Sequence, residues 1–111
     1  MEPISLESLA LSHRAARFNG KDHGTTISFF VTNHAPGEGP SLHRHPYPET
    51  FIVEQGAVTF TVGDEEVVTS AGNVVVVPAN TWHGFKNTGD EPLRQVSVHA
   101  APEIVQEFLD E

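Results

Sequence analysis

Apolar residues recur along the middle of the chain in short runs, which are separated by residues typical of turns. The runs are rich in β-branched and aromatic side chains, which favour β-strands. They cover residues 27–32, 50–54, 57–62, 66–69, 74–77, 81–86 and 93–99. Glycine, proline, asparagine or aspartate lies in the connections, as at Gly63-Asp64, where a hairpin turn is expected. Short strands with a spacing of about 8–12 residues predict an all-β sandwich or barrel.

The two ends of the chain carry weaker patterns. Residues 4–11 fit a strand or a short turn equally well, and the first 25 residues could form an edge strand or an arm swapped with a partner. Near the C-terminus, Pro102 fits the first position of a helix, and Glu103 favours a helix N-terminus. Apolar residues then share one face of the segment. We therefore expect a short C-terminal helix over residues 102–109, packed on the outside of the barrel.

Length and charge exclude several classes of function. The 111 residues fit one domain, 1–111, and the formal net charge of −9 disfavours binding to nucleic acid or to anionic membranes. The absence of cysteine excludes disulfides, thiolate metal sites and a cysteine nucleophile. The first residues lack the positive charge of a signal peptide, and every apolar run is too short to span a bilayer. The expectation is a soluble cytoplasmic protein.

Seven histidines outnumber the six lysines and arginines, and three of them suggest a metal site. His43 and His45 alternate across Arg44, so in an extended strand they point the same way with Cα atoms about 6.5 Å apart. Both imidazoles can then reach one ion at about 2.1 Å. Glu49 follows two prolines, and His83 comes from a separate strand. Three neutral imidazoles and one carboxylate suit Fe(II), Mn, Ni, Cu or Zn.

These residues belong to two longer motifs with a family resemblance. Residues 37–56 read G-x5-H-x-H-x3-E-x6-G, and residues 72–87 read G-x5-P-x-N-x2-H-x3-N. Both are similar to the two conserved-barrel motifs of the cupin superfamily. The one departure is Asn80, which stands where the pattern has glycine. Because asparagine tolerates the left-handed backbone conformation, the departure is a mild one.

The resemblance implies a cupin-type jelly-roll β-barrel that forms a homodimer and holds one divalent metal in its mouth. It assigns the metal ligands to His43, His45, Glu49 and His83. The alternative is a set of hydrogen-bonding core residues without metal. A buried glutamate beside three histidines is costly unless a cation or protons compensate its charge, which favours the metal. Because dioxygenases, isomerases, decarboxylases, storage proteins and sugar-sensing domains share this fold, the fold does not determine the reaction.

Alternation along the strands predicts the wall of the pocket. Phe51 and Val53 are in step with Glu49, and Phe85 is in step with His83, so the lining should be largely apolar and aromatic. By the same reasoning Arg44 and Trp82 point away from the metal ligands. His99 is either a pocket residue or, more simply, a surface residue at the end of its strand. The other histidines, His13, His23 and His34, have polar neighbours and are expected to be exposed.

The scarcity of cations near this pocket bears on the substrate. A phosphate-bearing substrate usually needs an arginine or lysine to bind it. The other cations precede the first firm strand or point away from the predicted ligands, and only for Arg94 does the sequence leave undecided which way the side chain faces. The sequence therefore favours a dioxygenase-like metalloenzyme that acts on a small neutral or aromatic compound, with Glu49 as a possible base. A metal-dependent isomerase or lyase is one alternative. The other is a non-catalytic barrel that binds or senses a small ligand.

Overall fold

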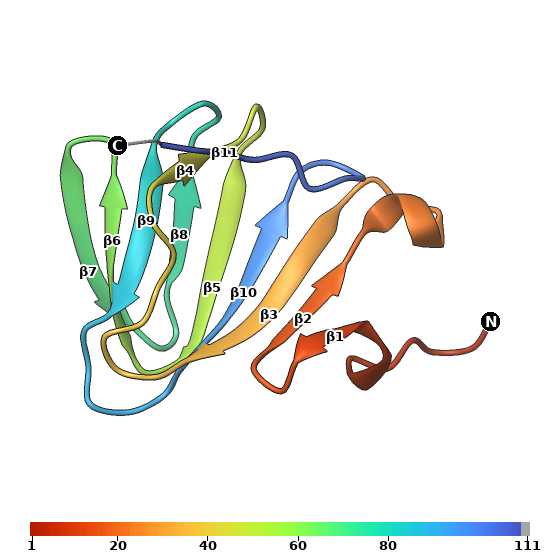
Figure 1. Ribbon diagram of the computed structural model, residues 1–111, viewed down its shortest axis with the longest axis horizontal. Helices are drawn as coiled ribbons and strands as arrows, with labels where there is room; N and C mark the ends of the chain where they lie inside the picture. Colours follow the sequence, from red (N-terminus) through yellow and green to blue (C-terminus); the bar gives the residue numbers. More distant parts are fainter. Residues whose placement is uncertain (110–111) are drawn as a thin grey trace.

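The computed structural model describes residues 1–109, which form two antiparallel β-sheets that face each other (Figure 1). The six-stranded sheet has the order β1-β2-β3-β10-β5-β8, and the five-stranded sheet has the order β11-β4-β9-β6-β7. The strands are β1 (Ala10–Ser12), β2 (Ala15–Phe18), β3 (Ser28–His34), β4 (His43–Arg44), β5 (Glu49–Gln55), β6 (Ala57–Val62), β7 (Glu65–Ser70), β8 (Val74–Val77), β9 (His83–Asn87), β10 (Leu93–His99) and β11 (Glu107–Phe108).

The register of β10 arranges the inner face of the six-stranded sheet in rows. Alternate residues of β10 are buried, as the period of a strand requires. His99 lies opposite Glu49 of β5, and Ser97 lies opposite Phe51. Gln95 lies opposite Val53. Each row therefore places a side chain of β10 next to one of β5, and the first row contains a predicted metal ligand.

A small apolar core holds the two sheets together. It consists of Phe51, Val53, Val58, Phe60, Val77 and Leu93, all of them buried. The rings of Phe51 and Phe60, from opposite sheets, have centroids 4.8 Å apart. Burial of each such side chain contributes about 1.5–3 kcal/mol relative to exposure. The core fills part of the space between the two sheets, and the buried histidines lie at one end of that space.

The all-β prediction is confirmed, and the predicted C-terminal helix is wrong. Residues 102–109 have no helix in the structure; they run as an extended segment that ends in β11, which pairs with β4. The carbonyl of Pro102, which a helix would use internally, accepts a hydrogen bond from the N–H of Lys21. Because a helix this short is marginal by itself, pairing with the barrel decides the conformation. We call residues 100–109 the C-terminal strap.

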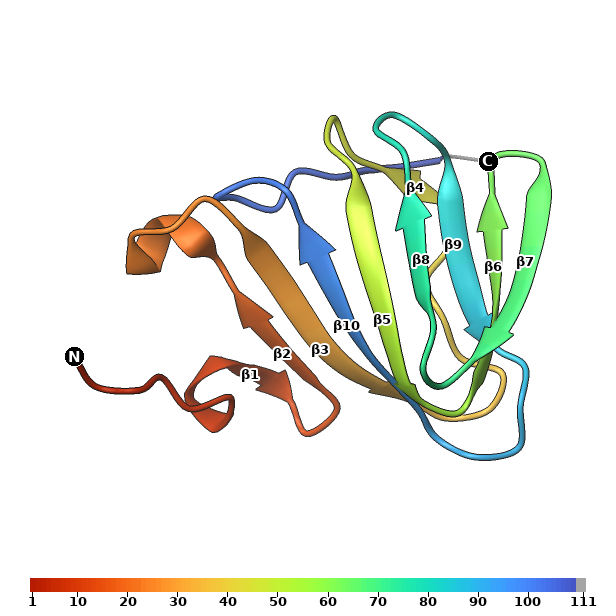
Figure 2. The same cartoon turned by 180° about the vertical axis from the view of Figure 1, so that it is seen from behind.

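The N-terminal residues extend the six-stranded sheet at one edge. Two 3₁₀ turns, Glu7–Leu9 and Gly20–His23, flank the hairpin of β1 and β2. β2 pairs with β3 of the same chain, and both views show the hairpin on the side away from β6 and β7 (Figures 1 and 2). Within residues 1–109, neither helical turn has the length and apolar character to cross a membrane.

Candidate metal centre

The structure brings together the four residues of the two motifs at one end of the barrel. β4 carries His43, the chain directly after it carries His45, β5 begins with Glu49, and β9 begins with His83. His43 and His83 are directly paired across neighbouring strands. All four side chains are buried, and one ligand atom from each lies within 4.8 Å of the others.

Backbone carbonyls orient the three imidazole rings. Nδ1 of His43 lies 2.8 Å from the carbonyl oxygen of Ser41, and Nδ1 of His83 lies 2.8 Å from that of Thr81. Nδ1 of His45 lies 2.9 Å from the carbonyl of Val105 in the strap. Because a carbonyl can only accept, each Nδ1 carries the proton, and the neutral ring presents the lone pair of Nε2. This is the tautomer that a metal ligand of this kind requires.

The carboxylate of Glu49 faces these lone pairs. Its Oε1 lies 2.9 Å from Nε2 of His45 and 2.9 Å from Nε2 of His83. Two acceptors at this distance repel each other unless a proton or a metal cation lies between them. Burial acts to raise the pKa of Glu49, but hydrogen bonds from the rings of His45, His83 and His99 lower that pKa well below its usual range. These bonds require a proton on each facing ring nitrogen, the place that a metal cation would take. The donor set therefore fits a divalent transition metal.

Burial keeps His43 available as a ligand. Desolvation lowers the pKa of His43, although its hydrogen bond to Ser41 acts in the opposite direction. Since the ring is then neutral near pH 7, its Nε2 lone pair is free for a metal. The cluster of His43, His45, Glu49 and His83 is consistent with one bound metal ion.

A fourth histidine adjoins the cluster. His99 is buried, and its Nε2 lies 3.1 Å from Oε2 of Glu49, the oxygen that faces away from His45 and His83. Its Nδ1 lies 2.7 Å from the hydroxyl of Tyr47. The interpretation of His99 as a surface residue is therefore wrong. Its burial was foreseeable from the alternation of β10, but the sequence carried no signal for Tyr47.

The C-terminal strap covers this end of the barrel. It runs from β10 to β4 along the top of the molecule in Figure 1. The N–H of Val105 donates to the hydroxyl of Tyr47 at 3.1 Å, and the Val105 carbonyl binds His45. The ring of Phe108 has its centroid 5.3 Å from that of His43. A segment far from the motifs in sequence thus completes the surroundings of two ligands.

Asn80 forms the turn between β8 and β9 that brings His83 to the cluster. Its φ angle is 61°, so the left-handed conformation expected at this position is confirmed. The N–H of Asn80 donates to the carbonyl of His45 at 2.7 Å. One turn therefore positions His83 and connects it to the loop of a second ligand.

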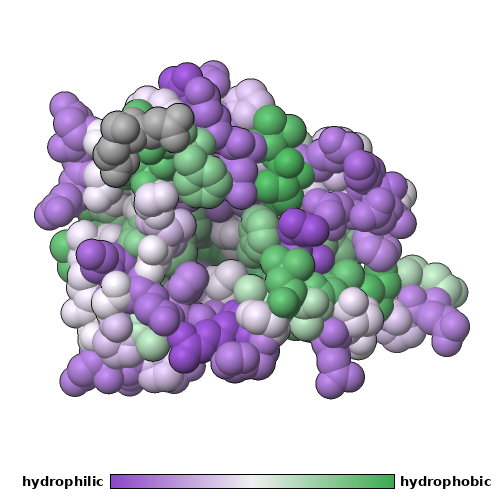
Figure 3. All heavy atoms as spheres, viewed as in Figure 1, coloured by the Kyte–Doolittle hydropathy of each residue, from purple (hydrophilic) through white to green (hydrophobic). Residues whose placement is uncertain are grey.

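A cavity of about 460 Å³ opens beside the cluster. The face in Figure 3 is hollowed near its centre, with apolar residues along the hollow. Of the predicted pocket residues, Phe51, Phe85 and His99 line the cavity, whereas Val53 lies in the core instead. His34, expected to be exposed, is half-buried, lines the cavity and contacts the ring of Phe85 at a centroid distance of 5.1 Å.

The arginines lie outside this cavity. The guanidinium of Arg44 lies 4.3 Å from the centre of the Trp82 ring, and its Nε donates to Glu107 of the strap. Arg94 forms an ion pair with Glu54 at 3.0 Å. Within residues 1–109, neither lysine nor arginine lines the cavity.

Comparisons with known proteins agree with this architecture. A family model described as a cupin domain matches residues 30–99. The uncharacterized protein YrkC of Bacillus subtilis is 33% identical over 96 residues, which are 80% of this chain and 50% of that protein. A gentisate 1,2-dioxygenase of a Ralstonia species is 38% identical over 69 residues, 60% of this chain and 19% of the enzyme.

Solved structures with a similar fold also match this chain. An oxalate decarboxylase of Lactobacillus farciminis in complex with formate has a TM-score of 0.78 and 26% identity, and covers 90% of this chain and 32% of its own. The chain spans about half the length of YrkC and of two other curated relatives, and 19% of the gentisate dioxygenase.

Proposed function

Since the chain belongs to the cupin superfamily, we propose that it is a metal-dependent enzyme of dioxygenase-like type that acts on a small neutral or aromatic compound. The observation that carries the proposal is the arrangement of His45, His83 and Glu49, whose lone pairs converge on one point beside a cavity. His43, His45, Glu49 and His83 would hold a divalent metal, which would supply Lewis-acid or redox chemistry to an oxygen donor of a substrate.

The residues around the cluster have separate tasks in this proposal. The carbonyls of Ser41, Thr81 and Val105 hold the imidazoles in the ligand tautomer. The rings of Phe51 and Phe85 line the cavity next to the ligands, where they bind an apolar ring and exclude water. Glu49 lines the cavity and is the proposed base for a substrate proton, a task that requires it to detach from the histidines, because these lower its pKa and make it a weak base in this arrangement.

The charge of the cavity supports a neutral substrate. Its lining contains the carboxylates of Glu38 and Glu49. Arg14 is ion-paired with Glu38 from outside the cavity, and within the described residues no lysine or arginine lines the cavity itself. A small dicarboxylate such as oxalate would have only the metal to neutralise it. The name of one relative, a gentisate 1,2-dioxygenase, points to an aromatic ring, which would suit the aromatic walls here, but the carboxylate of gentisate would find no cationic side chain in this lining.

Metal content tests the first half of the proposal. We expect wild-type protein, purified without added metal, to contain close to one transition-metal ion per chain, and His43→Ala/His83→Ala to contain almost none. His13→Ala/His23→Ala removes two exposed histidines and serves as the matched control. Metal at 100 times its Kd should also stabilise the wild type by about 2.7 kcal/mol. A wild type that takes up no metal even after supplementation would contradict the site.

Oxygen consumption tests the second half. The Fe(II) and Mn(II) forms should consume O₂ faster than the free metal does when catechols or flavonols are added, and the His43→Ala/His83→Ala variant should not. Tight binding of such compounds without oxygen uptake would instead support the non-catalytic binding barrel. Product formation without oxygen uptake would support the isomerase or lyase.

A further inference from the structure

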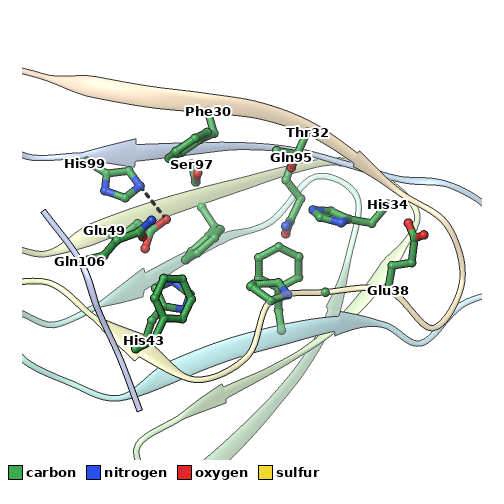
Figure 4. A pocket seen from close by; sticks show the side chains of 15 residues that line it. Phe30, Thr32, His34, Glu38, His43, Glu49, Gln95, Ser97, His99 and Gln106 are labelled. Atoms are coloured by element: carbon green, nitrogen blue, oxygen red, sulfur yellow. Dashed lines mark ion pairs between the residues drawn. The ribbon is translucent and has the colours of Figure 1, made fainter. Parts of the chain in front are cut away.

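The cavity has a second polar end, which the proposed function does not use. Gln95 lines the cavity and is 1% exposed, yet neither its amide oxygen nor its amide nitrogen has a hydrogen-bond partner among residues 1–109. Figure 4 shows Gln95 beside Thr32 and His34, on the opposite side of the cavity from Glu49 and His99. Such a buried amide is exceptional in a folded protein, because most buried polar groups are paired.

An unpaired amide discriminates between ligands. Both amide atoms are already without a partner in the unliganded protein, and an apolar ligand end leaves them so. A ligand with a hydroxyl or carbonyl at the right place supplies the missing partner. Satisfying one such buried group corresponds to roughly 5- to 150-fold in affinity.

The surroundings of Gln95 favour an uncharged group. Burial lowers the pKa of the neighbouring His34, so this ring is neutral near pH 7. Glu38 lines the cavity together with them, and Arg14 balances its charge in an ion pair, so this end offers a charged ligand group no unpaired opposite charge. A hydroxyl can donate to the amide oxygen, and a carbonyl can accept from the amide nitrogen.

The register of β10 gives the length of the ligand. Gln95 and His99 both face inward four residues apart, which separates their Cα atoms by about 13 Å along the strand. Between them lies the row of Phe30, Ser97 and Phe51, and Phe85 lines the same cavity. A ligand that reaches both ends is therefore longer than one ring, with an apolar middle.

We propose that Gln95 determines specificity, by selecting ligands that carry a neutral hydroxyl or carbonyl at the end remote from the metal residues. This inference rests on the proposed function in one respect: it assumes that the near end of the ligand binds at the metal residues. The probes are naphthalene-2,3-diol, which offers two adjacent oxygens to the metal, and naphthalene-2,3,6-triol, which adds one hydroxyl at the far end.

Calorimetry with the Zn(II)-loaded protein tests the inference without turnover, because zinc is not redox-active. The wild type should bind the triol at least about fivefold more tightly than the diol. Gln95→Met, of similar length and without the amide, should bind both equally and bind the diol no more weakly than the wild type. Gln55→Met, on the exposed end of β5, should keep the wild-type preference. An unchanged triol preference in Gln95→Met overturns the inference.

Two further results separate this inference from the proposed function. If the diol binds the wild type no better than it binds His43→Ala/His83→Ala, the metal-dependent function fails. The thermal stability of metal-free Gln95→Met then decides the role of Gln95 independently. We expect a melting temperature equal to or above that of the wild type, because a buried unpaired amide has been removed. A decrease of more than about 5 °C would show that Gln95 supports the fold, and would overturn its role in recognition.

Discussion

Asn80 illustrates at the scale of one residue how a motif can change without losing its geometry. The left-handed conformation at this position costs most L-residues about 1–2 kcal/mol, and asparagine is among the few that adopt it routinely. The turn must keep this shape because the N–H of Asn80 binds the carbonyl of His45. The backbone, more than the side chain, is therefore what this position contributes to the metal centre.

Substitutions at Asn80 should follow the backbone requirement. Asn80→Gly is expected to change the free energy of unfolding by less than about 0.5 kcal/mol, whereas Asn80→Ala should lower it by about 1 kcal/mol. Urea unfolding of the metal-free proteins measures both. An alanine variant as stable as the glycine variant would contradict the argument from the φ angle.

The single residues of the site were predictable to different degrees. His43, His45, Glu49 and His83 stand in motifs whose spacing is visible in the sequence. His99 required the register between β10 and β5, which pairs it with Glu49, and alternation within one strand does not give that register. The unpaired amide of Gln95 depends on every side chain around it, so no local pattern could indicate it.

At the scale of elements, the C-terminal strap is where local propensity was misleading. Residues 102–109 have a helix-like pattern, but the partners that fix them lie about sixty positions earlier in the chain. Val105 is bound to His45 and to Tyr47, and Glu107 to Arg44. Tertiary hydrogen bonds of this kind override a weak helix preference, and sequence periodicity does not report them.

Tyr47 should hold the strap in place. Tyr47→Phe removes the hydroxyl that accepts from Val105 and contacts His99, leaving buried polar atoms without a partner. We expect the free energy of unfolding to fall by about 1–3 kcal/mol. Amide hydrogen exchange should become faster at Val105 and Leu109, while the amides of β6 keep their relative protection. Protection of the strap equal to that of the wild type would show that Tyr47 does not anchor it.

At the scale of the whole molecule, two facing sheets enclose both an apolar core and a set of buried polar residues that includes the metal-site cluster. The pattern predicted β3 and β5 to β10 within about two residues, and with them an all-β fold, but β1, β2, β4 and β11 were not among the predicted runs. The sequence pattern could not predict which end of the barrel is open, because that depends on which end the C-terminal strap crosses. The histidines also divide differently from expectation, since His34 and His99 line the cavity together with the predicted ligand His43.

The buried histidines should make the stability of the metal-free protein depend on pH. Burial lowers the pKa of His34 and of His43, so the unfolded chain takes up protons before the folded protein does as the pH falls through about 6.5. The free energy of unfolding should therefore decrease toward acid, by up to about 1.4 kcal/mol per pH unit for each such histidine.

Urea unfolding between about pH 5.5 and 7.5, with a chelator present, measures this slope around the ordinary histidine pKa. His34→Asn should flatten it, with His13→Asn at an exposed position as the control. A stability that is constant or rises toward acid would contradict the direction of both shifts.

The three carbonyls behind the imidazoles have a consequence for how the sequence can vary. They belong to Ser41, Thr81 and Val105. Because every amino acid supplies a backbone carbonyl, the side chains at these positions can be replaced without changing the orientation of the histidine rings. Chain length is different. Two of the carbonyls lie two residues before the histidine they orient, and one inserted or deleted residue there would break the relation. The metal centre should thus tolerate substitutions in these loops but not insertions or deletions.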